Sequence, residues 1–245
     1  MKKIFLLTAV LSLFASGCIS IGNGIPVEKN YALPQIPDVI SIDGAWRVEI
    51  ICNAAENSCR IILDDNLQDK YSVSVGKKLK VSLPDCIRPM SAPILKIKTV
   101  KTFSELSLDG NLICYVKGVD AERDMEIELD GYAVCVFDDG KAKKIEANVS
   151  DFAKLTLKCK AQIIDAELDR RAVLDVAEVD DLHLDLSDNA ASRIGKCKNA
   201  AVEASDNSFV EFKSVTSLLE DVSGNAAVKY PIVVPEELRR KKDKR

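Results

Sequence analysis

Carboxylates recur at regular intervals in the second half of this 245-residue chain, and they are the first candidates for chemistry. They fall into two series, Glu105, Glu126, Glu146 and Asp165, and Glu128, Glu167, Asp185, Glu203 and Asp221. Flexible carboxylates suit Ca²⁺, a hard cation that binds oxygen ligands. One hypothesis is therefore that Glu126, Glu128 and Glu146 bind Ca²⁺ weakly or attract a cationic partner; no other cofactor is indicated. The alternative, which we favour, is an acidic face that maintains solubility.

The eight cysteines offer a second kind of chemistry. Cys52 and Cys59 flank a polar turn between two strands, so they could close a hairpin disulfide. Cys114 and Cys135 occupy equivalent inward positions of neighbouring repeats, where the Cβ atoms lie too far apart for an unstrained bridge. We expect this second pair to be buried free thiols that act as small apolar residues.

Catalytic machinery is not evident in the sequence. His183 is the only histidine, and no serine or cysteine is placed to form a triad with it. No glycine-rich phosphate-binding loop is visible, because the Asp-Gly and Ser-Gly-Asn pairs recur as turns. We therefore predict that the protein is not an enzyme.

A repeat that runs from residue 104 to residue 230 must position these side chains. Each unit has an apolar anchor followed by turn residues, and the anchors are Leu108, Leu129, Val149, Leu168, Leu186, Ala204 and Val222. Their spacings are 21, 20, 19, 18, 18 and 18 residues, and such a period is typical of a solenoid. After each turn, small and large apolar residues alternate, which indicates strands. The sequence thus predicts an all-β, three-sided parallel β-helix of about seven regular coils.

Four apolar residues should point outward from two adjacent coils of this β-helix: Ile113, Tyr115, Val134 and Val136. A contiguous apolar patch on a surface normally has a cover. Two covers remain open at this point, namely the N-terminal hairpins of the same chain and a partner protein.

The N-terminus has the features of an export signal. Lys2 and Lys3 precede an apolar run from Ile4 to Phe14, which is too short to span a membrane. The small residues that lead to Cys18 resemble a bacterial lipobox, in which the cysteine receives a lipid. We expect residues 1–17 to be removed and Cys18 to anchor an exported lipoprotein in the cell envelope, at the outer membrane. The alternative is an ordinary secretory signal with an incidental cysteine.

The rest of the chain divides into three parts. Residues 18–37 contain several glycines and prolines and are predicted to be an extended tether behind the lipid. Residues 38–230 form one β-helical domain, in which 38–103 are less regular. We expect hairpins or irregular coils there, because the open end of a β-helix must be covered. Residues 231–245 form a basic tail, either solvated or in weak contact with an anionic membrane.

These features together resemble the putative auto-transporter adhesin family with a head GIN domain. The matching motifs are Gly22–Gly24 (GNG), Val39–Ile50 (VISIDGAWRVEI), Asp64–Leu67 (DDNL), Val75–Leu83 (VGKKLKVSL) and Ser223–Tyr230 (SGNAAVKY). The resemblance covers nearly all of the mature chain. It implies a right-handed β-helix in an exported, often lipid-anchored protein, and the family name implies adhesion. It supplies no catalytic residues.

Composition narrows the function further. The net charge of −4 argues against a nucleic-acid partner. We predict a non-enzymatic binding or adhesion module that is held at the membrane by its lipid and recognises an unknown protein or glycan. Two alternatives are a carbohydrate-active β-helix enzyme, either lyase or hydrolase, and a purely structural envelope protein.

Overall fold

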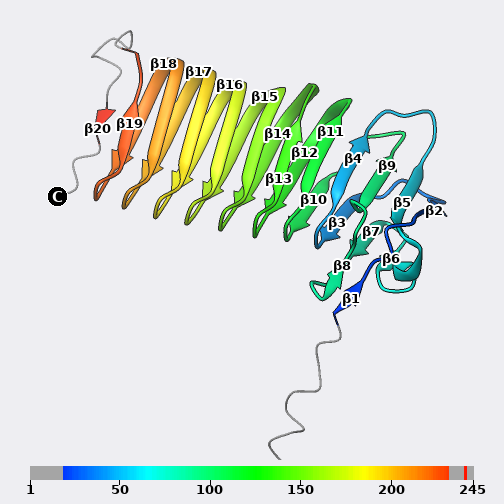
Figure 1. The fold of residues 1–245 in the computed structure, drawn as a ribbon. Helices are drawn as coiled ribbons and strands as arrows, with labels where there is room; N and C mark the ends of the chain where they lie inside the picture. Colours follow the sequence, from blue (N-terminus) through cyan, green and yellow to red (C-terminus); the bar gives the residue numbers. More distant parts are fainter. Residues whose placement is uncertain (1–18, 232–239, 242–245) are drawn as a thin grey trace, which may run out of the picture.

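The computed structural model describes residues 19–231 and 240–241. These residues form β-strands, turns and one short 3-10 helix, η2 (Asp65–Leu67), and they contain no α-helix. The strands stack as parallel coils along one axis, with a less regular cap at the N-terminal end (Figure 1). The predicted solenoid of about seven coils with an N-terminal cap is confirmed. Within the described part of the chain, no helix is long and apolar enough to cross a bilayer.

The regular coils are built from ten strands that pair in parallel with the equivalent position of the next coil. These strands are β10 (Glu105–Asp109), β11 (Ile113–Lys117), β12 (Val119–Leu129), β13 (Val134–Phe137), β14 (Gly140–Val149), β15 (Lys154–Leu168), β16 (Val173–Leu186), β17 (Ala191–Ala204), β18 (Phe209–Val222) and β19 (Ala227–Lys229). The pairing is in register, so that Leu155 lies beside Leu174. Equivalent side chains therefore form columns that run along the solenoid.

Each coil has three sides, which the burial pattern of β16 makes clear. The buried residues of this strand are Leu174, Val176, Val179, Leu182, Leu184 and Leu186. The alternation slips by one residue after Val176 and again after Val179, because the backbone turns a corner at these points. We name the sides by their place in this coil: side A is 173–176, side B is 178–180 and side C is 182–186. In earlier coils, β4, β11 and β13 belong to side A, and β3 and β10 to side C.

The corner between side C and side A is a tight turn in every coil. One residue of each turn has a positive φ between 57° and 98°: Gly110, Gly131, Asp151, Arg170, Asp188, Asp206 and Gly224. At Gly110 an added Cβ would lie 3.0 Å from the backbone of Gly44 in the neighbouring coil. Glycine fits this site because it has no side chain and accepts a positive φ without strain. The turn predicted after each anchor is thus confirmed.

The N-terminal cap does not stack in chain order. Its strands are β1 (Ser20–Ile21), β2 (Pro26–Ala32), β3 (Val39–Asp43), β4 (Arg47–Ile51), β5 (Ser58–Asp64), β6 (Ser72–Ser74), β7 (Lys78–Ser82), β8 (Ile87–Arg88) and β9 (Ile94–Lys98). The coil of β3 and β4 lies between that of β10 and β11 and that of β7 and β9. The chain therefore makes one coil, folds outward to cover it, and returns to continue the solenoid.

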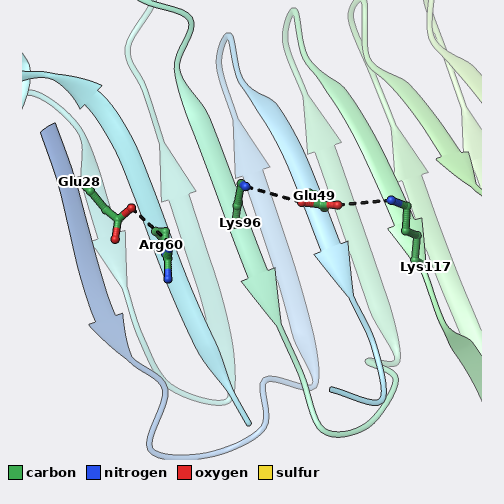
Figure 2. Close-up of polar contacts among 5 residues, drawn as sticks. All are labelled: Glu28, Glu49, Arg60, Lys96 and Lys117. Carbon is green, nitrogen blue, oxygen red and sulfur yellow. Dashed lines mark hydrogen bonds and ion pairs between the residues drawn. The ribbon is translucent and has the colours of Figure 1, made fainter. Parts of the chain in front are cut away.

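Ion pairs cross the strands of side A where the cap joins the coils. The strand order here is β2, β5, β9, β4 and β11. Figure 2 shows Arg60 beside Glu28 at 3.3 Å, and Glu49 between Lys96 at 4.0 Å and Lys117 at 3.3 Å. All five side chains are at least one-third exposed, so each pair adds at most about 1 kcal/mol of stability. These five charged side chains nevertheless follow the spatial order of the strands, which differs from their order along the chain.

The tether predicted for residues 18–37 is wrong from residue 19 onward. β2 pairs antiparallel with β5 over seven residues, and β1 pairs with β8. The physical reason is that β5 would otherwise present an unpaired edge at the end of the sheet. The signal at residues 1–17 and Cys18 lie outside the described residues.

The basic tail also departs from the prediction at one point. β20 (Arg240–Lys241) pairs in parallel with Leu219 and Glu220 of β18. The end of the last complete coil thus gains a short partner strand. Residues 232–239 and 242–245 lie outside the described part of the chain.

Candidate functional site

Side C carries the acidic columns predicted from the sequence. In the first column Glu105 pairs with Glu126, which pairs with Glu146, and Glu146 pairs with Asp165. In the second column, Glu128 is followed by Asn148, Glu167, Asp185 and Glu203. Neighbouring members of a column belong to strands about 4.8 Å apart. The fold therefore concentrates negative charge along one side of the solenoid.

A groove runs along side C next to the turns. Its volume is about 540 Å³, and its acidic lining residues are Asp109, Glu128, Asp130, Glu167, Asp169 and Asp185. No lysine or arginine occurs among the described residues that line this acidic groove. The Oδ1 atom of Asp169 is buried without a hydrogen-bond partner in the described part of the chain. Buried acceptors are normally paired, so this atom is an exception among the described residues. The excess of negative charge in the acidic groove comes from its six carboxylates.

Asp109 is the middle member of a short aspartate column in the acidic groove. It pairs with Asp43 on one side, and Asp130 occupies the same position in the next coil. Ser82 donates a hydrogen bond of 2.9 Å to Asp43, and Ser150 donates one of the same length to Asp130. Desolvation between the coils, together with the charges of Asp130 and Asp43, raises the pKa of Asp109.

We expect Asp109→Asn to stabilise the fold at pH 7 by about 0.5–1 kcal/mol, which is the repulsion of unit charges about 5 Å apart in water. The raised pKa means that ionised Asp109 favours the unfolded chain. This cost is absent well below the ordinary aspartate pKa of about 3.9 and complete above the folded pKa. The gain should therefore vanish near pH 3. Urea unfolding of both proteins at pH 3 and pH 7 measures it, and a gain at pH 3 equal to that at pH 7 would contradict the electrostatic cause.

The first acidic column is partly neutralised within the protein. Lys144 lies 2.6 Å from Glu146 and 2.7 Å from Asp165, and these hydrogen bonds raise the pKa of Lys144. His183 Nδ1 lies 2.8 Å from Asp165 Oδ1. His183 is thus an exposed member of this column and a hydrogen-bond partner of Asp165. The acidic groove, by contrast, has no lysine or arginine among its described lining residues.

The proposed Ca²⁺ ligands do not gather into a cluster. Glu126 and Glu146 are partners, but the partner of Glu128 on the next coil is Asn148, and Lys144 contacts Glu146. In residues 19–231 and 240–241, no group of three or more His, Cys, Asp or Glu side chains is placed to hold a metal ion. The structure therefore gives the Ca²⁺ hypothesis no geometric support.

The predicted apolar patch lies on side A. Ile113 pairs with Val134 and Tyr115 with Val136, and Ile113 and Tyr115 are 43% and 48% exposed. The N-terminal hairpins do not cover them, because those hairpins extend the stack along its axis. The interpretation as self-packing is therefore wrong, and the interface at this patch stays a prediction.

Cys52 and Cys59 are free, and the disulfide hypothesis for them is wrong. Strand β9 lies between β5, which contains Cys59, and β4, which ends one residue before Cys52. Ile97 of β9 lies beside Ile50 of β4 on one side and beside Cys59 on the other. Two strand spacings are roughly 9.6 Å, which exceeds the Cα separation that a disulfide allows. Cys114 and Cys135 are in-register neighbours, buried and free, as predicted. Burial raises the pKa of Cys52 to about 11 and that of Cys59 to about 12, so these thiols are poor nucleophiles.

Sequence reasoning missed a set of polar contacts in the cap. The side chain of Asp64 is fully buried and accepts hydrogen bonds from the backbone N–H groups of Met90 and Ser91. Asn66 accepts a bond from the N–H of Asn23 and donates one to the carbonyl of Ile21. The GNG and DDNL motifs were visible as parts of the resemblance, but contacts between residues 26 to 45 positions apart leave no periodic signal. We call Asp64 and Asn66 the cap latch.

Comparison with known proteins places the fold. No protein-family model matches the sequence, and no curated protein matches it. Solved structures do match. A putative lipid binding protein from Parabacteroides distasonis ATCC 8503 superposes with a TM-score of 0.68 at 16% identity. A putative adhesin from Bacteroides fragilis NCTC 9343 superposes with a TM-score of 0.66 at 12% identity. A putative adhesin from Parabacteroides merdae ATCC 43184 superposes with a TM-score of 0.59 at 18% identity.

Each of these three matches covers 86% of this chain and 98% of the other. The similarity therefore includes the irregular cap as well as the coils. At such low identity it shows the fold alone, which is a capped parallel β-solenoid.

Proposed function

We propose that this protein is an exported, non-enzymatic binding or adhesion module, anchored in the bacterial envelope by a lipid on Cys18. We further propose that the acidic groove on side C takes a lysine- or arginine-rich segment of a partner protein. The observation that carries this proposal is the set of six carboxylates that line the acidic groove, with no cation among its described lining residues. Solved structures of the same fold are described as putative adhesins or as a lipid binding protein, which supports a binding role.

A cationic polypeptide fits the acidic groove better than a glycan does. Sugar-binding sites usually place aromatic rings against the sugar, and no aromatic residue occurs among the described residues that line the groove. The carboxylates that line the groove can accept charge-assisted hydrogen bonds, which an ammonium or guanidinium group supplies. Peptide cations would also relieve the repulsion within the aspartate column that contains Asp109.

The test compares two triple variants that remove the same charge. Glu128→Gln/Glu167→Gln/Asp185→Asn neutralises the acidic groove, whereas Glu56→Gln/Glu122→Gln/Asp124→Asn neutralises exposed carboxylates elsewhere. We expect the groove variant to bind an oligolysine peptide at least tenfold more weakly at 0.15 M salt, and the control variant to bind within about twofold of the unmodified protein. Equal losses in both would show that the protein attracts cations only through its net charge.

A parallel screen addresses the alternatives. The unmodified protein is incubated with host-matrix proteins and with polysaccharides, and bound protein and released reducing sugar are both measured. Binding to basic proteins without sugar release is the expected result. Sugar release that disappears in Asp109→Asn would instead indicate a glycan-cleaving enzyme and would overturn the proposal.

A further inference from the structure

We infer that the N-terminal cap rests on the membrane through four exposed apolar side chains, Ile19, Ile21, Ile25 and Met90, which we call the membrane patch. This inference rests on the proposed lipid at Cys18 and goes beyond it. A lipid on a flexible tether would leave the domain free to tumble. A lipid next to an ordered, apolar surface would hold the domain on the bilayer in one orientation.

The chain is ordered immediately after the proposed lipid site. Ser20 donates a backbone hydrogen bond of 3.1 Å to Cys86, and Gly22 donates one of 2.9 Å to Arg88. These bonds hold β1 against β8, and Figure 1 shows this pair at one edge of the cap, below β3 and β7. The first residues after Cys18 are therefore part of the folded domain.

The cap latch fixes the segment from residue 21 to residue 25. Asn66 bonds to the backbone of Ile21 and of Asn23, each at 2.9 Å. A Cβ added to Gly22 would lie 1.7 Å from the Asp64 carboxylate, so this carboxylate packs directly on the chain. The carbonyl of Ile25 accepts a hydrogen bond of 2.8 Å from the N–H of Asp65. The segment that carries Ile21 and Ile25 is thus tied to the cap on both sides.

The same bonds bring Met90 next to the segment that carries the three isoleucines. Asp64, which packs on Gly22, also accepts a bond of 2.7 Å from the N–H of Met90. The Cβ of Met90 lies 3.8 Å from the position that a Cβ of Gly24 would take. Ile19, Ile21, Ile25 and Met90 are nevertheless 58%, 64%, 59% and 70% exposed. Large apolar groups gathered on a surface mark a place of interaction.

The short stretch of chain between Cys18 and the membrane patch indicates what covers the patch. Ile21 is three residues after Cys18, and an extended chain spans at most about 3.6 Å per residue. The membrane patch therefore begins within about 11 Å of the lipidated residue, which must itself lie at the bilayer surface. A protein partner would have to enter this narrow space, whereas lipid fills it without competition.

The distribution of charge along the domain also favours an orientation in which the cap faces the bilayer. Residues 19–103 contain 11 Lys and Arg and 9 Asp and Glu, whereas residues 104–230 contain 15 and 26. Arg88 is exposed and lies beside Ile21 in the pairing of β1 with β8. Anionic phospholipid attracts basic groups near its surface and repels the acidic coils. The acidic groove then remains available for a cationic partner.

A native thiol reports on this contact. Cys86 is the only exposed thiol among the seven cysteines that the structure describes, and its carbonyl accepts the bond from Ser20. We would purify the lipidated protein, reconstitute it into vesicles of phosphatidylethanolamine and phosphatidylglycerol, and follow modification by a membrane-impermeant maleimide. Lys213→Cys, an exposed position on β18, provides a reference thiol on the distal coils.

We expect Cys86 to react at least fivefold more slowly than the thiol of Lys213→Cys in these vesicles. Ile21→Ser/Ile25→Ser/Met90→Ser should bring the two rates within twofold while the protein stays on the vesicles. An unchanged melting temperature would show that the triple variant is folded. If Cys86 reacts as fast as the reference in the unmodified protein, the docking inference is overturned. Failure of the protein to stay on vesicles would instead contradict the lipid anchor.

Discussion

Replacing the buried Ala190 by leucine should lower the free energy of unfolding by about 1–3 kcal/mol, the cost of inserting extra methylenes into a packed core. Ala190 is 1% exposed and lies in the inward column of small residues formed by Ala133, Ala153, Ala172, Ala190 and Ser208. The column is small because the chain passes the tight corner here, and the coils above and below leave no space for a branched side chain. Urea unfolding at pH 7 measures the loss.

The adjacent residue provides a matched control. Ala191 begins β17 and points outward between Val173 and Phe209 of the neighbouring coils. Ala191→Leu makes the same chemical change on the other face of the strand, where it adds apolar contact with these two side chains. We expect its free energy of unfolding to stay within about 0.5 kcal/mol of the unmodified protein. Equal losses in the two variants would mean that inside and outside are assigned wrongly, since a slip of one residue exchanges the faces.

The regular coils could be predicted because their interactions are local and repeated. Each coil contacts only its neighbours, so the sequence between Ser104 and Tyr230 records the same inward columns again and again. The in-register pairing also explains why the acidic columns were visible, since Glu126 and Glu146 occupy the same place in successive repeats. Residues that recur with the period of the repeat therefore lie side by side in the folded solenoid.

The cap could not be predicted in the same way. Its coil of β7 and β9 stacks beneath the earlier coil of β3 and β4, so spatial order departs from chain order. This departure also defeated the disulfide hypothesis, because closeness of Cys52 and Cys59 in sequence suggested a simple hairpin. The strand β9, more than 30 residues later in the chain, separates them. No local sequence pattern predicts that a later strand will lie between two earlier ones.

The candidate site could be predicted only in part, because its ion pairs also depend on contacts between coils. The sequence shows which carboxylates share a column but not which lysines turn toward them from a corner. Lys144 lies in β14 two residues before Glu146, yet it bridges to Asp165 of the next coil. A lysine therefore lies beside Glu146 and Asp165, whereas no lysine or arginine occurs among the described residues that line the acidic groove.

The second prediction with a large expected effect on stability concerns the cap latch. Asp64→Ala should lower the free energy of unfolding of the cap by about 2–3 kcal/mol, because it leaves the N–H groups of Met90 and Ser91 without their partner. Asp65→Ala is the matched control: the neighbouring side chain is exposed, and its change should cost less than about 0.5 kcal/mol. Hydrogen exchange of the Met90 and Ser91 amides, measured with urea unfolding, would locate the loss in the cap.

The latch also predicts how stability depends on pH. Burial alone would raise the pKa of Asp64, but hydrogen bonds from Ser91, Met90 and Gly24 outweigh it and hold the pKa below its ordinary value. A lowered folded pKa means that the ionised group favours the folded state. Its contribution is complete above about pH 5 and is lost as the pH falls below about 4, towards the folded pKa. The difference in stability between the unmodified protein and Asp64→Ala should therefore shrink from pH 6 to pH 3. A difference that stays constant over this range would show that the side chain acts by packing and that its charge contributes nothing. A latch that releases in acid would also free the segment that carries Ile21. Acid slows the maleimide reaction of every thiol, because the thiolate is the reacting form. The rate of Cys86 relative to that of the reference thiol of Lys213→Cys should therefore rise on vesicles over the same range.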